Sequence, residues 1–433
     1  MMEYLPILVL VFSFLVLLLT GVPVAWSIAI SSLLTMMVSI PFLPALTTVS
    51  QRIATGLDSF ALLAIPFFVL SGQLMNKGGI ANRLIDFAKT LVGSLPGGLA
   101  LINVIAAMLM GSIAGSAMAS ASAMGSILGP EMEKEGYSKE FGAAVNITSS
   151  TVGLIIPPSN VLIVYSLASG GVSIAALFIA GYIPGILTGL LLMIVASFWA
   201  KKKGYKVGKR STLKEVGKTF LKAFPSLTLL FVIIGGIVAG IFTATEASAV
   251  AVLYTLILGF YYKEIKLKNL PEILLDSCGT TAIVMLLIGA SMSMSWVMSY
   301  ENIPQDISNL LLSLSDNPIL ILLIINLLLL FVGIFMDMTP AVLIFTPIFL
   351  PIINELGMNP IQFGIVMVLN LCVGLCTPPV GSVLFVGVGV ANTTIEKVIK
   401  PLLPLFFAMI VSLLLVTYFS ELSLWLPRMF GLL

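Results

Sequence analysis

The chain has 433 residues, of which 59% are hydrophobic and only 9% are charged, and its net charge is +2. Soluble domains carry about 25% charged residues, so this composition excludes a soluble domain and indicates an integral membrane protein. The apolar runs are continuous and do not alternate with polar residues, which excludes a β-barrel and predicts an all-α, polytopic helical bundle with about ten to twelve spans.

Residues 1–200 are expected to form the first of two repeats. Spans are predicted at about 5–20, 24–43, 57–76, 97–111 and 174–200, with an amphipathic stretch at 82–93 in the membrane interface. The segment 111–136 is too apolar for a loop but is interrupted by small residues, so a re-entrant hairpin at about 112–136 is predicted, with its tip near Gly115–Ser120. A helix face of small residues made for close packing is the alternative.

A double proline, Pro157-Pro158, interrupts the next apolar segment, which predicts a broken helix at about 140–168. Proline removes a backbone donor and displaces the carbonyl four residues earlier, and backbone groups within a membrane must be paired by protein or water. Freed carbonyls beside hydroxyls are hard oxygen ligands suited to Na⁺, and the following half-helix offers its N-terminus to an anion. A kink that serves packing alone is the alternative.

The segment 201–222 carries nine of the 21 basic residues and a single acid, Glu215. The positive-inside rule places this segment on the cytoplasmic side, and its position in mid-chain predicts a linker between the halves. A site for lipid headgroups is the alternative.

Residues 223–433 are expected to repeat the order of the first half. Spans are predicted at 223–240, 244–262, 277–299, 317–335 and 394–420, an amphipathic stretch at 305–314, a hairpin at about 335–356 with its tip at Asp337–Pro340, and a broken helix at about 360–390. Gly153 and Gly374, and likewise Pro157 and Pro378, are separated by the same 221 residues. Half-length repeats are typical of secondary transporters, whose binding sites lie at the repeat interface. With the broken helix counted as a sixth crossing beside these five spans, each half has an even number of crossings, which by itself would make the repeats parallel.

Two acidic residues lie in apolar surroundings. Asp337 is a functional candidate by its position, with capping of a hairpin helix as the alternative. Glu246 follows Thr243 at capping-box spacing, which favours an N-terminal cap over ion chemistry.

Enzymatic chemistry is disfavoured by the residue types. The chain has no histidine, the commonest general base, and Asp337 is the only aspartate set well inside an apolar run, whereas an intramembrane aspartyl hydrolase needs two. The three cysteines, Cys278, Cys372 and Cys376, are expected to pack as small apolar residues, because Cys-x₃-Cys without histidine is poor metal-ligand spacing. The net charge gives no indication of a nucleic-acid partner.

Three stretches carry a resemblance to a known family: GSIAGSAMASASAMG, GPEMEKEGYSKEFGAAVNITSSTVGLIIPPSN, and MDMTPAVLIFTPIFLP followed by LNLCVGLCTPPVG. They resemble the large membrane subunit of tripartite ATP-independent periplasmic (TRAP) transporters over essentially the whole chain. The resemblance implies Na⁺-driven, elevator-type uptake of an organic acid across the bacterial inner membrane, with inverted repeats and no cofactor besides the coupling ion. The stretch PPSNVLIVYSLASGGVSIAALFIAGYIPG looks closest to that of sialic-acid members. A C4-dicarboxylate or another sugar acid is also compatible as substrate.

The same resemblance implies two partners and a set of site residues. The partners are a small four-helix membrane subunit, expected as a separate chain, and a periplasmic substrate-binding protein. One Na⁺ site would use Ser112, Ser116, Ser149, Gly153 and Pro157; the other would use Asp337, Thr339, Gly374, Thr377 and Pro378; substrate would lie near Ser120, Ser159, Asn160 and Thr377. The main rivals are a standalone Na⁺-coupled anion carrier of the same superfamily, which needs no binding protein, and a channel.

Overall fold

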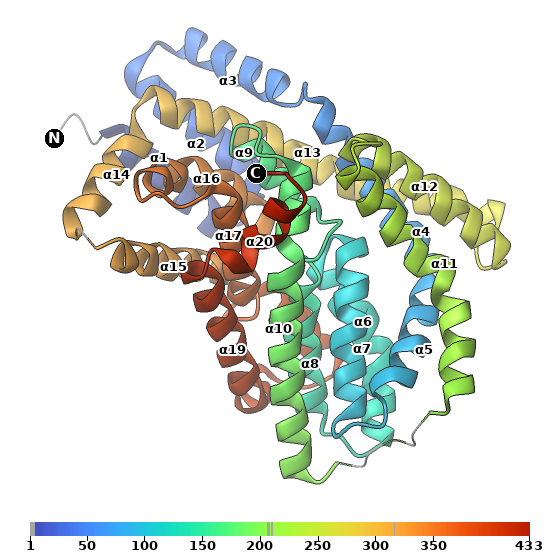
Figure 1. Cartoon of the computed structure of the whole chain (residues 1–433). Helices are drawn as coiled ribbons and strands as arrows, with labels where there is room; N and C mark the ends of the chain where they lie inside the picture. Colours follow the sequence, from blue (N-terminus) through green and yellow to red (C-terminus); the bar gives the residue numbers. More distant parts are fainter. Residues whose placement is uncertain (1–4, 206–207, 209–210, 316) are drawn as a thin grey trace.

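The computed structural model describes residues 5–205, 208, 211–315 and 317–433, apart from the side chains of 81 and 112–114, and every regular element in this part is helical (Figure 1). The first half contains α1 (Leu5–Leu19), α2 (Val24–Ser39), α3 (Phe42–Gly56), η1 (Phe60–Leu63), α4 (Ala64–Lys77), α5 (Ile80–Val92), α6 (Gly98–Ala114), α7 (Ala117–Lys134), α8 (Lys139–Val152), α9 (Asn160–Ala168) and α10 (Ile174–Lys203). The second contains α11 (Leu213–Val238), α12 (Ala244–Tyr261), η2 (Leu267–Asn269), α13 (Leu270–Tyr300), α14 (Ile303–Leu314), α15 (Pro318–Phe335), α16 (Met338–Glu355), α17 (Pro360–Gly374), α18 (Ser382–Val390), α19 (Ile395–Tyr418) and α20 (Glu421–Met429).

The helices have the lengths of membrane spans. Within the described residues, eight are long and apolar enough to cross a membrane: η1 with α4, α10, α11, α12, η2 with α13, α15, α16 and α19. Four shorter apolar helices are α1, α2, the Gly98–Gly111 part of α6, and α17. The predicted all-α, polytopic membrane fold is therefore confirmed.

The first hairpin consists of α6 and α7, which pack against each other and turn at Gly115–Ser116. Gly115 takes a left-handed conformation with φ of 63°, which glycine adopts without steric cost. Ser116 then caps α7, because its hydroxyl accepts a hydrogen bond from the backbone N–H of Ala119 at 3.3 Å. The predicted tip is confirmed, but the expected span at 97–111 is the first arm of this hairpin and not a separate crossing.

The second hairpin consists of α15 and α16 and turns at Met336–Asp337. Met336 and Asp337 are both extended, and Asp337 occupies the N-cap position of α16. The hairpin was predicted at 335–356, but it begins earlier, at the start of α15. Its first arm is the helix that was predicted as a separate span at 317–335. A continuous apolar helix looks the same in sequence whether it crosses the membrane or turns back.

Both predicted broken helices are present. α8 ends at Val152 and α9 begins at Asn160; α17 ends at Gly374 and α18 begins at Ser382. The Pro157–Pro158 and Pro378–Pro379 peptide bonds that lie within the breaks are both cis. From Ile361 to Gly374, α17 is buried on every side, so its apolar residues face protein all round.

The two broken helices cross in opposite directions at the centre of the molecule. The hydroxyl of Tyr165, near the end of α9, donates to the carbonyl of Pro360 at the start of α17. At the other end, Lys139 at the start of α8 lines the same small cavity as Ala391, which follows α18. At the crossing, the Cys372 thiol donates to the Thr151 carbonyl at 3.1 Å. Cys372 and Cys376 are buried and serve packing here, as predicted, whereas Cys278 is exposed.

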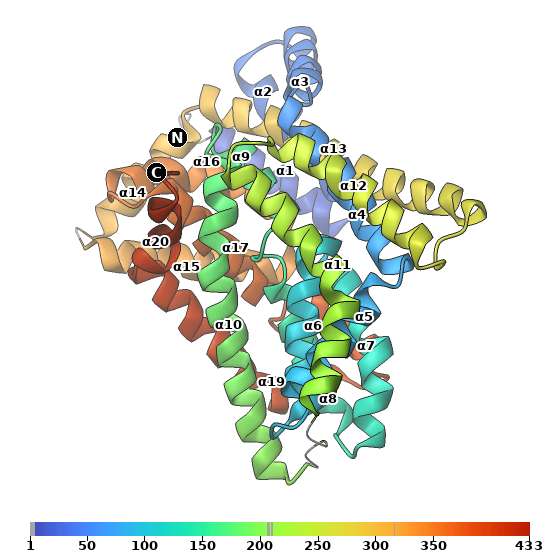
Figure 2. The same cartoon turned by 45° about the vertical axis from the view of Figure 1, so that its right-hand side comes forward.

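The final helices of the halves are also antiparallel. α10 and α19 pack side by side (Figures 1 and 2), and Thr188 at the middle of α10 meets Ser412 in the second half of α19, with hydroxyl oxygens 2.7 Å apart. Gln362, at the start of α17, donates to the carbonyls of Val416 and Thr417 near the end of α19. The repeats are therefore inverted, and the parallel arrangement suggested by the span count is wrong because two expected spans are hairpin arms.

The non-helical linker between the two halves is shorter than the predicted segment 201–222. α10 continues to Lys203 and α11 already begins at Leu213, so most of 201–222 is helical. A capping box starts α11: Thr212 accepts from the N–H of Glu215, whose carboxylate accepts from the N–H of Thr212. The predicted box of Thr243 and Glu246 is confirmed at the start of α12, with the carboxylate 2.8 Å from the N–H of Thr243.

Two helices lie outside the expected elements. α3 lies in a stretch where no element was predicted, and α20 follows the last expected span. Figure 2 shows α3 away from the crossing of the broken helices, alongside α13. α13 is continuous over 31 residues, whereas the matching part of the first half is divided into α3, η1 and α4.

Candidate functional site

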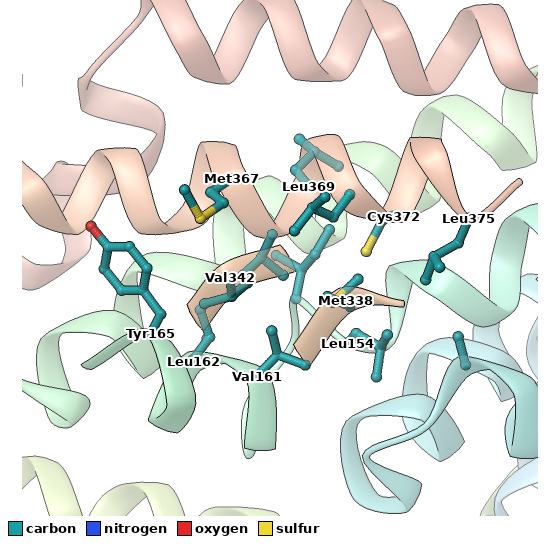
Figure 3. Packing of buried hydrophobic residues seen from close by; sticks show 14 of the residues in the cluster. Leu154, Val161, Leu162, Tyr165, Met338, Val342, Met367, Leu369, Cys372 and Leu375 are labelled. Carbon is teal, nitrogen blue, oxygen red and sulfur yellow. The ribbon is translucent and has the colours of Figure 1, made fainter. Parts of the chain in front are cut away.

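The two hairpin tips meet at one cavity of about 240 Å³. Figure 3 shows the packing beside it, with Met338 and Val342 of α16 lying between α9 and α17. The described residues that line the cavity come from both tips, both broken helices and α13: Gly115, Ser116, Ala117, Met118, Leu154, Val161, Thr280, Ile283, Val284, Leu287, Asp337, Met338, Thr339, Leu375 and Val383. A cavity built from equivalent parts of two inverted repeats is typical of the binding site of a secondary transporter.

Asp337 is the only charged residue among those lining residues. Its side chain is exposed, and although Asp337 holds the N-cap position of α16, it makes no capping hydrogen bond from its side chain. Capping of α16 therefore does not account for Asp337. Around it the polar groups are hydroxyls, those of Ser116, Thr280 and Thr339. Carboxylate and hydroxyl oxygens suit a hard cation.

Each hairpin meets its broken helix through a pair of glycines. A Cβ added to Gly153 would lie 2.5 Å from the Cα of Gly111, and one added to Gly374 would lie 2.6 Å from the Cα of Gly333. The backbones of α6 and α8, and of α15 and α17, therefore touch with no side chain between them. Each contact lies shortly before a hairpin tip, so it brings the backbone of the hairpin close to that of the broken helix.

The family follows from comparison with known proteins. The family model described as "Tripartite ATP-independent periplasmic transporter, DctM component" matches residues 11–422. The chain belongs to this family. It is accordingly a transporter permease of the bacterial inner membrane and not an enzyme.

Several relatives cover this chain almost completely. It is 55% identical over 430 residues to the uncharacterized protein YgiK of Salmonella typhimurium, with 99% of each chain covered. It is 40% identical to the C4-dicarboxylate TRAP transporter large permease protein DctM of Pseudomonas aeruginosa, with 94% and 95% covered. Identity to the sialic acid TRAP transporter large permease protein SiaM of Vibrio cholerae is 37%, with 97% and 98% covered. The named relatives thus differ in substrate.

A solved structure shares the fold. The YdaH transporter of Alcanivorax borkumensis superposes with a TM-score of 0.63 at 13% identity, and the match covers 92% of the present chain and 91% of the YdaH chain. At this identity the likeness concerns the fold alone.

The expected residues of the first Na⁺ site are only partly gathered at the cavity. Ser116 lines it, and Gly153 touches Gly111 three residues before the helix of the hairpin arm ends. Ser149 lies deeper in α8, where its hydroxyl donates to Asn103 of α6 at 3.0 Å. Pro157 is buried, and the side chain of Ser112 lies outside the described residues.

The second expected Na⁺ site is the more complete. Asp337 and Thr339 line the cavity, and Gly374 forms the glycine contact beside them. The Thr377 hydroxyl donates to the Val373 carbonyl at 2.8 Å, which leaves its oxygen lone pairs available as ligands. Pro378 follows within the break and is half-buried.

The residues expected near substrate have different surroundings. Ser159 is buried and its hydroxyl donates to the Leu154 carbonyl at 2.5 Å, so it closes the break before α9. Ser120 is buried in α7, and its hydroxyl has no hydrogen-bond partner. Asn160 lies against the first hairpin tip, because a Cβ at Gly115 would be 2.4 Å from its amide nitrogen. Asn160 is therefore the substrate candidate most directly joined to a tip.

The contribution of α13 to the cavity was missed. Thr280, Ile283, Val284 and Leu287 follow helical spacing along one face of α13 and line the cavity opposite the tips. The sequence around them is an ordinary apolar span, so no local signal separates this face from one that contacts lipid. Only the packing of α13 against α16 reveals it.

Proposed function

We propose that this chain carries out Na⁺-coupled uptake of an organic acid, with substrate bound between the two hairpin tips. The observation that supports the proposal most directly is the shared cavity, where equivalent parts of two inverted repeats meet around one carboxylate, Asp337. Hydroxyls, glycine-exposed backbone and helix termini supply the remaining binding groups, as expected for a site within the membrane.

The charge of the cavity suggests why uptake depends on a cation. The described lining residues include no lysine or arginine, so an anionic substrate meets only the negative charge of Asp337. Two like charges about 6 Å apart repel by roughly 3 kcal/mol at an effective dielectric constant of about 20. A Na⁺ ion held by Asp337 with Thr339 and Thr377 removes this repulsion. Cation binding then precedes and permits anion binding, which couples the two.

We further propose that the transporter has an elevator mechanism and acts with two partners, a small membrane subunit and a periplasmic substrate-binding protein. Membership in the tripartite family supports the partners, and the inverted repeats support alternating access. The substrate is an organic acid, with sialic acid favoured from the sequence motifs and C4-dicarboxylates a close competitor, because relatives at 37% and 40% identity are named for each.

Uptake into liposomes tests this function. The chain is reconstituted with its small subunit, and labelled sialic acid or succinate is offered together with the matching binding protein under an inward Na⁺ gradient. We expect uptake of one of these acids that requires both the gradient and the binding protein. Gradient-driven uptake by the chain alone would support a standalone carrier instead, and uptake that persists without Na⁺ would refute the coupling.

Asp337→Asn tests the ion site itself. The amide keeps the size of the side chain and removes its charge, so we expect the Na⁺ concentration for half-maximal uptake to rise at least tenfold, or about 1.4 kcal/mol. Asp306→Asn is the matched control, because Asp306 lies in the first turn of α14 and does not line the cavity. Equal Na⁺ dependence of the two variants would contradict the assignment.

A further inference from the structure

A second large cavity, of about 550 Å³, lies on the outer face of α10, away from the hairpin tips. It is lined by α10 together with the ends of α5 and α6 and the loop between them: Val92, Leu95, Pro96, Leu101, Leu190, Met193, Ile194, Ser197, Phe198 and Lys201. We call it the α10 groove. Leu190, Ile194 and Phe198 are exposed along it, so the groove opens toward the lipid.

The length of the α10 groove along the helix is close to the thickness of one membrane leaflet. Its residues on α10 recur every three or four positions from Leu190 to Lys201, and thus form one stripe along the helix. Eleven residues of α-helix rise about 16 Å, which is close to half of the roughly 30 Å hydrocarbon thickness of a bilayer. The stripe therefore extends from the middle of the membrane to one surface.

The surface end of the groove is basic. Lys201 is its only charged lining residue among those described, and it forms no ion pair with any described residue. Lys202 and Lys203 follow in the last turn of α10 and are also exposed. By the positive-inside rule this end faces the cytoplasm, whose leaflet carries the anionic lipids that attract such residues.

We propose that the α10 groove binds one anionic phospholipid of the cytoplasmic leaflet, with an acyl chain along Leu190–Phe198 and the phosphate at Lys201. The apolar walls of the groove match the acyl chain in length, and the positive charge of the unpaired Lys201 ammonium group complements the negative charge of the lipid headgroup. A zwitterionic lipid would fill the walls but leave the lysine without a net counter-charge.

The lipid would also join α10 to the start of the first hairpin. Leu95 and Pro96 line the groove, the Ser197 hydroxyl donates to the Pro96 carbonyl at 2.9 Å, and a Cβ at Gly97 would lie 2.9 Å from the Cβ of Ala200. This loop connects α5 to the arm α6 that ends at the substrate cavity. A lipid that contacts both sides of the groove stabilises the loop against α10.

Thermal unfolding of the purified chain in detergent tests the proposal, with phosphatidylglycerol or phosphatidylcholine titrated into each sample. We expect phosphatidylglycerol to raise the unfolding temperature more than phosphatidylcholine does. Lys201→Gln should weaken the phosphatidylglycerol effect about fivefold in apparent affinity, which corresponds to ~1 kcal/mol per basic residue. Lys203→Gln, in the same helical turn but outside the groove, should change it less than twofold.

A second variant separates the groove from a general attraction to the basic surface. Ile194→Trp narrows the apolar walls and leaves every lysine in place, so we expect it also to reduce the phosphatidylglycerol effect. The proposal is overturned if Lys201→Gln and Lys203→Gln behave alike, or if Ile194→Trp has no effect. Equal stabilisation by soluble glycerol phosphate, or site-specific cross-linking of the groove to the small subunit, would also overturn it.

Discussion

The glycine contact between α6 and α8 can be tested by adding a single methyl group. In Gly153→Ala the new Cβ would lie 2.5 Å from the Cα of Gly111 and 2.7 Å from the carbonyl oxygen of Ala107. Carbon atoms normally approach to about 3.5–4.0 Å, so the two helices must separate by roughly 1 Å. Both obstacles are backbone atoms, which cannot move aside as a side chain can. Overpacking of this kind costs about 1–3 kcal/mol.

Gly235→Ala is the matched control for this variant. Gly235 lies inside α11 and is exposed, and an added Cβ would meet nothing within 4 Å. Because alanine favours a helix over glycine by up to ~1 kcal/mol, the control should unfold at the same or a higher temperature. We expect Gly153→Ala to unfold several degrees lower and to lose most Na⁺-driven uptake. Equal unfolding temperatures and equal uptake for the two variants would refute the reasoning.

Two further predictions concern helix ends. Gly115→Ala combines left-handed backbone strain with a Cβ 2.4 Å from the Asn160 amide nitrogen, whereas Gly136→Ala, at φ of 85° with open space around it, carries the strain alone. Both variants should lose about 1–2 kcal/mol of stability. Only Gly115→Ala should also abolish uptake, so equal uptake by the two variants would contradict a role for the tip contact. Thr243→Ala removes the capping box of α12 and should lower the unfolding temperature by the equivalent of ~1 kcal/mol. Thr243→Ser keeps the capping hydroxyl and should unfold at nearly the original temperature. A serine variant as unstable as the alanine variant would show that the cap is not responsible.

The positions of the chain breaks were predictable because their causes are local. Gly115 at the first tip, the two double prolines and the spacing of Thr243 and Glu246 each affect the backbone within a few residues. The extent of the hairpins was not predictable, because α6 and α15 are apolar helices in either topology. Whether such a helix crosses the membrane or is a hairpin arm depends on the helices that pack against it.

For the hydroxyl residues of the site, the sequence likewise predicts their positions along the chain but not their contacts. The sequence places Ser149, Ser159 and Thr377 beside the double prolines, but it does not show which atoms they contact. In the fold, Ser149 donates to Asn103 of α6 and Ser159 donates to Leu154, while Asp337 makes no capping bond. Separating structural hydroxyls from free oxygen ligands requires the neighbouring helix, which is far away in sequence.

The sequence by itself determined that this is an all-α membrane protein of two related halves, each with a broken helix and a hairpin tip, because composition and proline chemistry act on local structure. Tertiary structure alone decided that the halves are inverted and that their tips share a cavity with α13. It also decided that paired glycines allow the hairpin and broken helix to touch. These features depend on which apolar surfaces meet, and in a chain that is apolar almost throughout, many pairings look alike until the helices are packed.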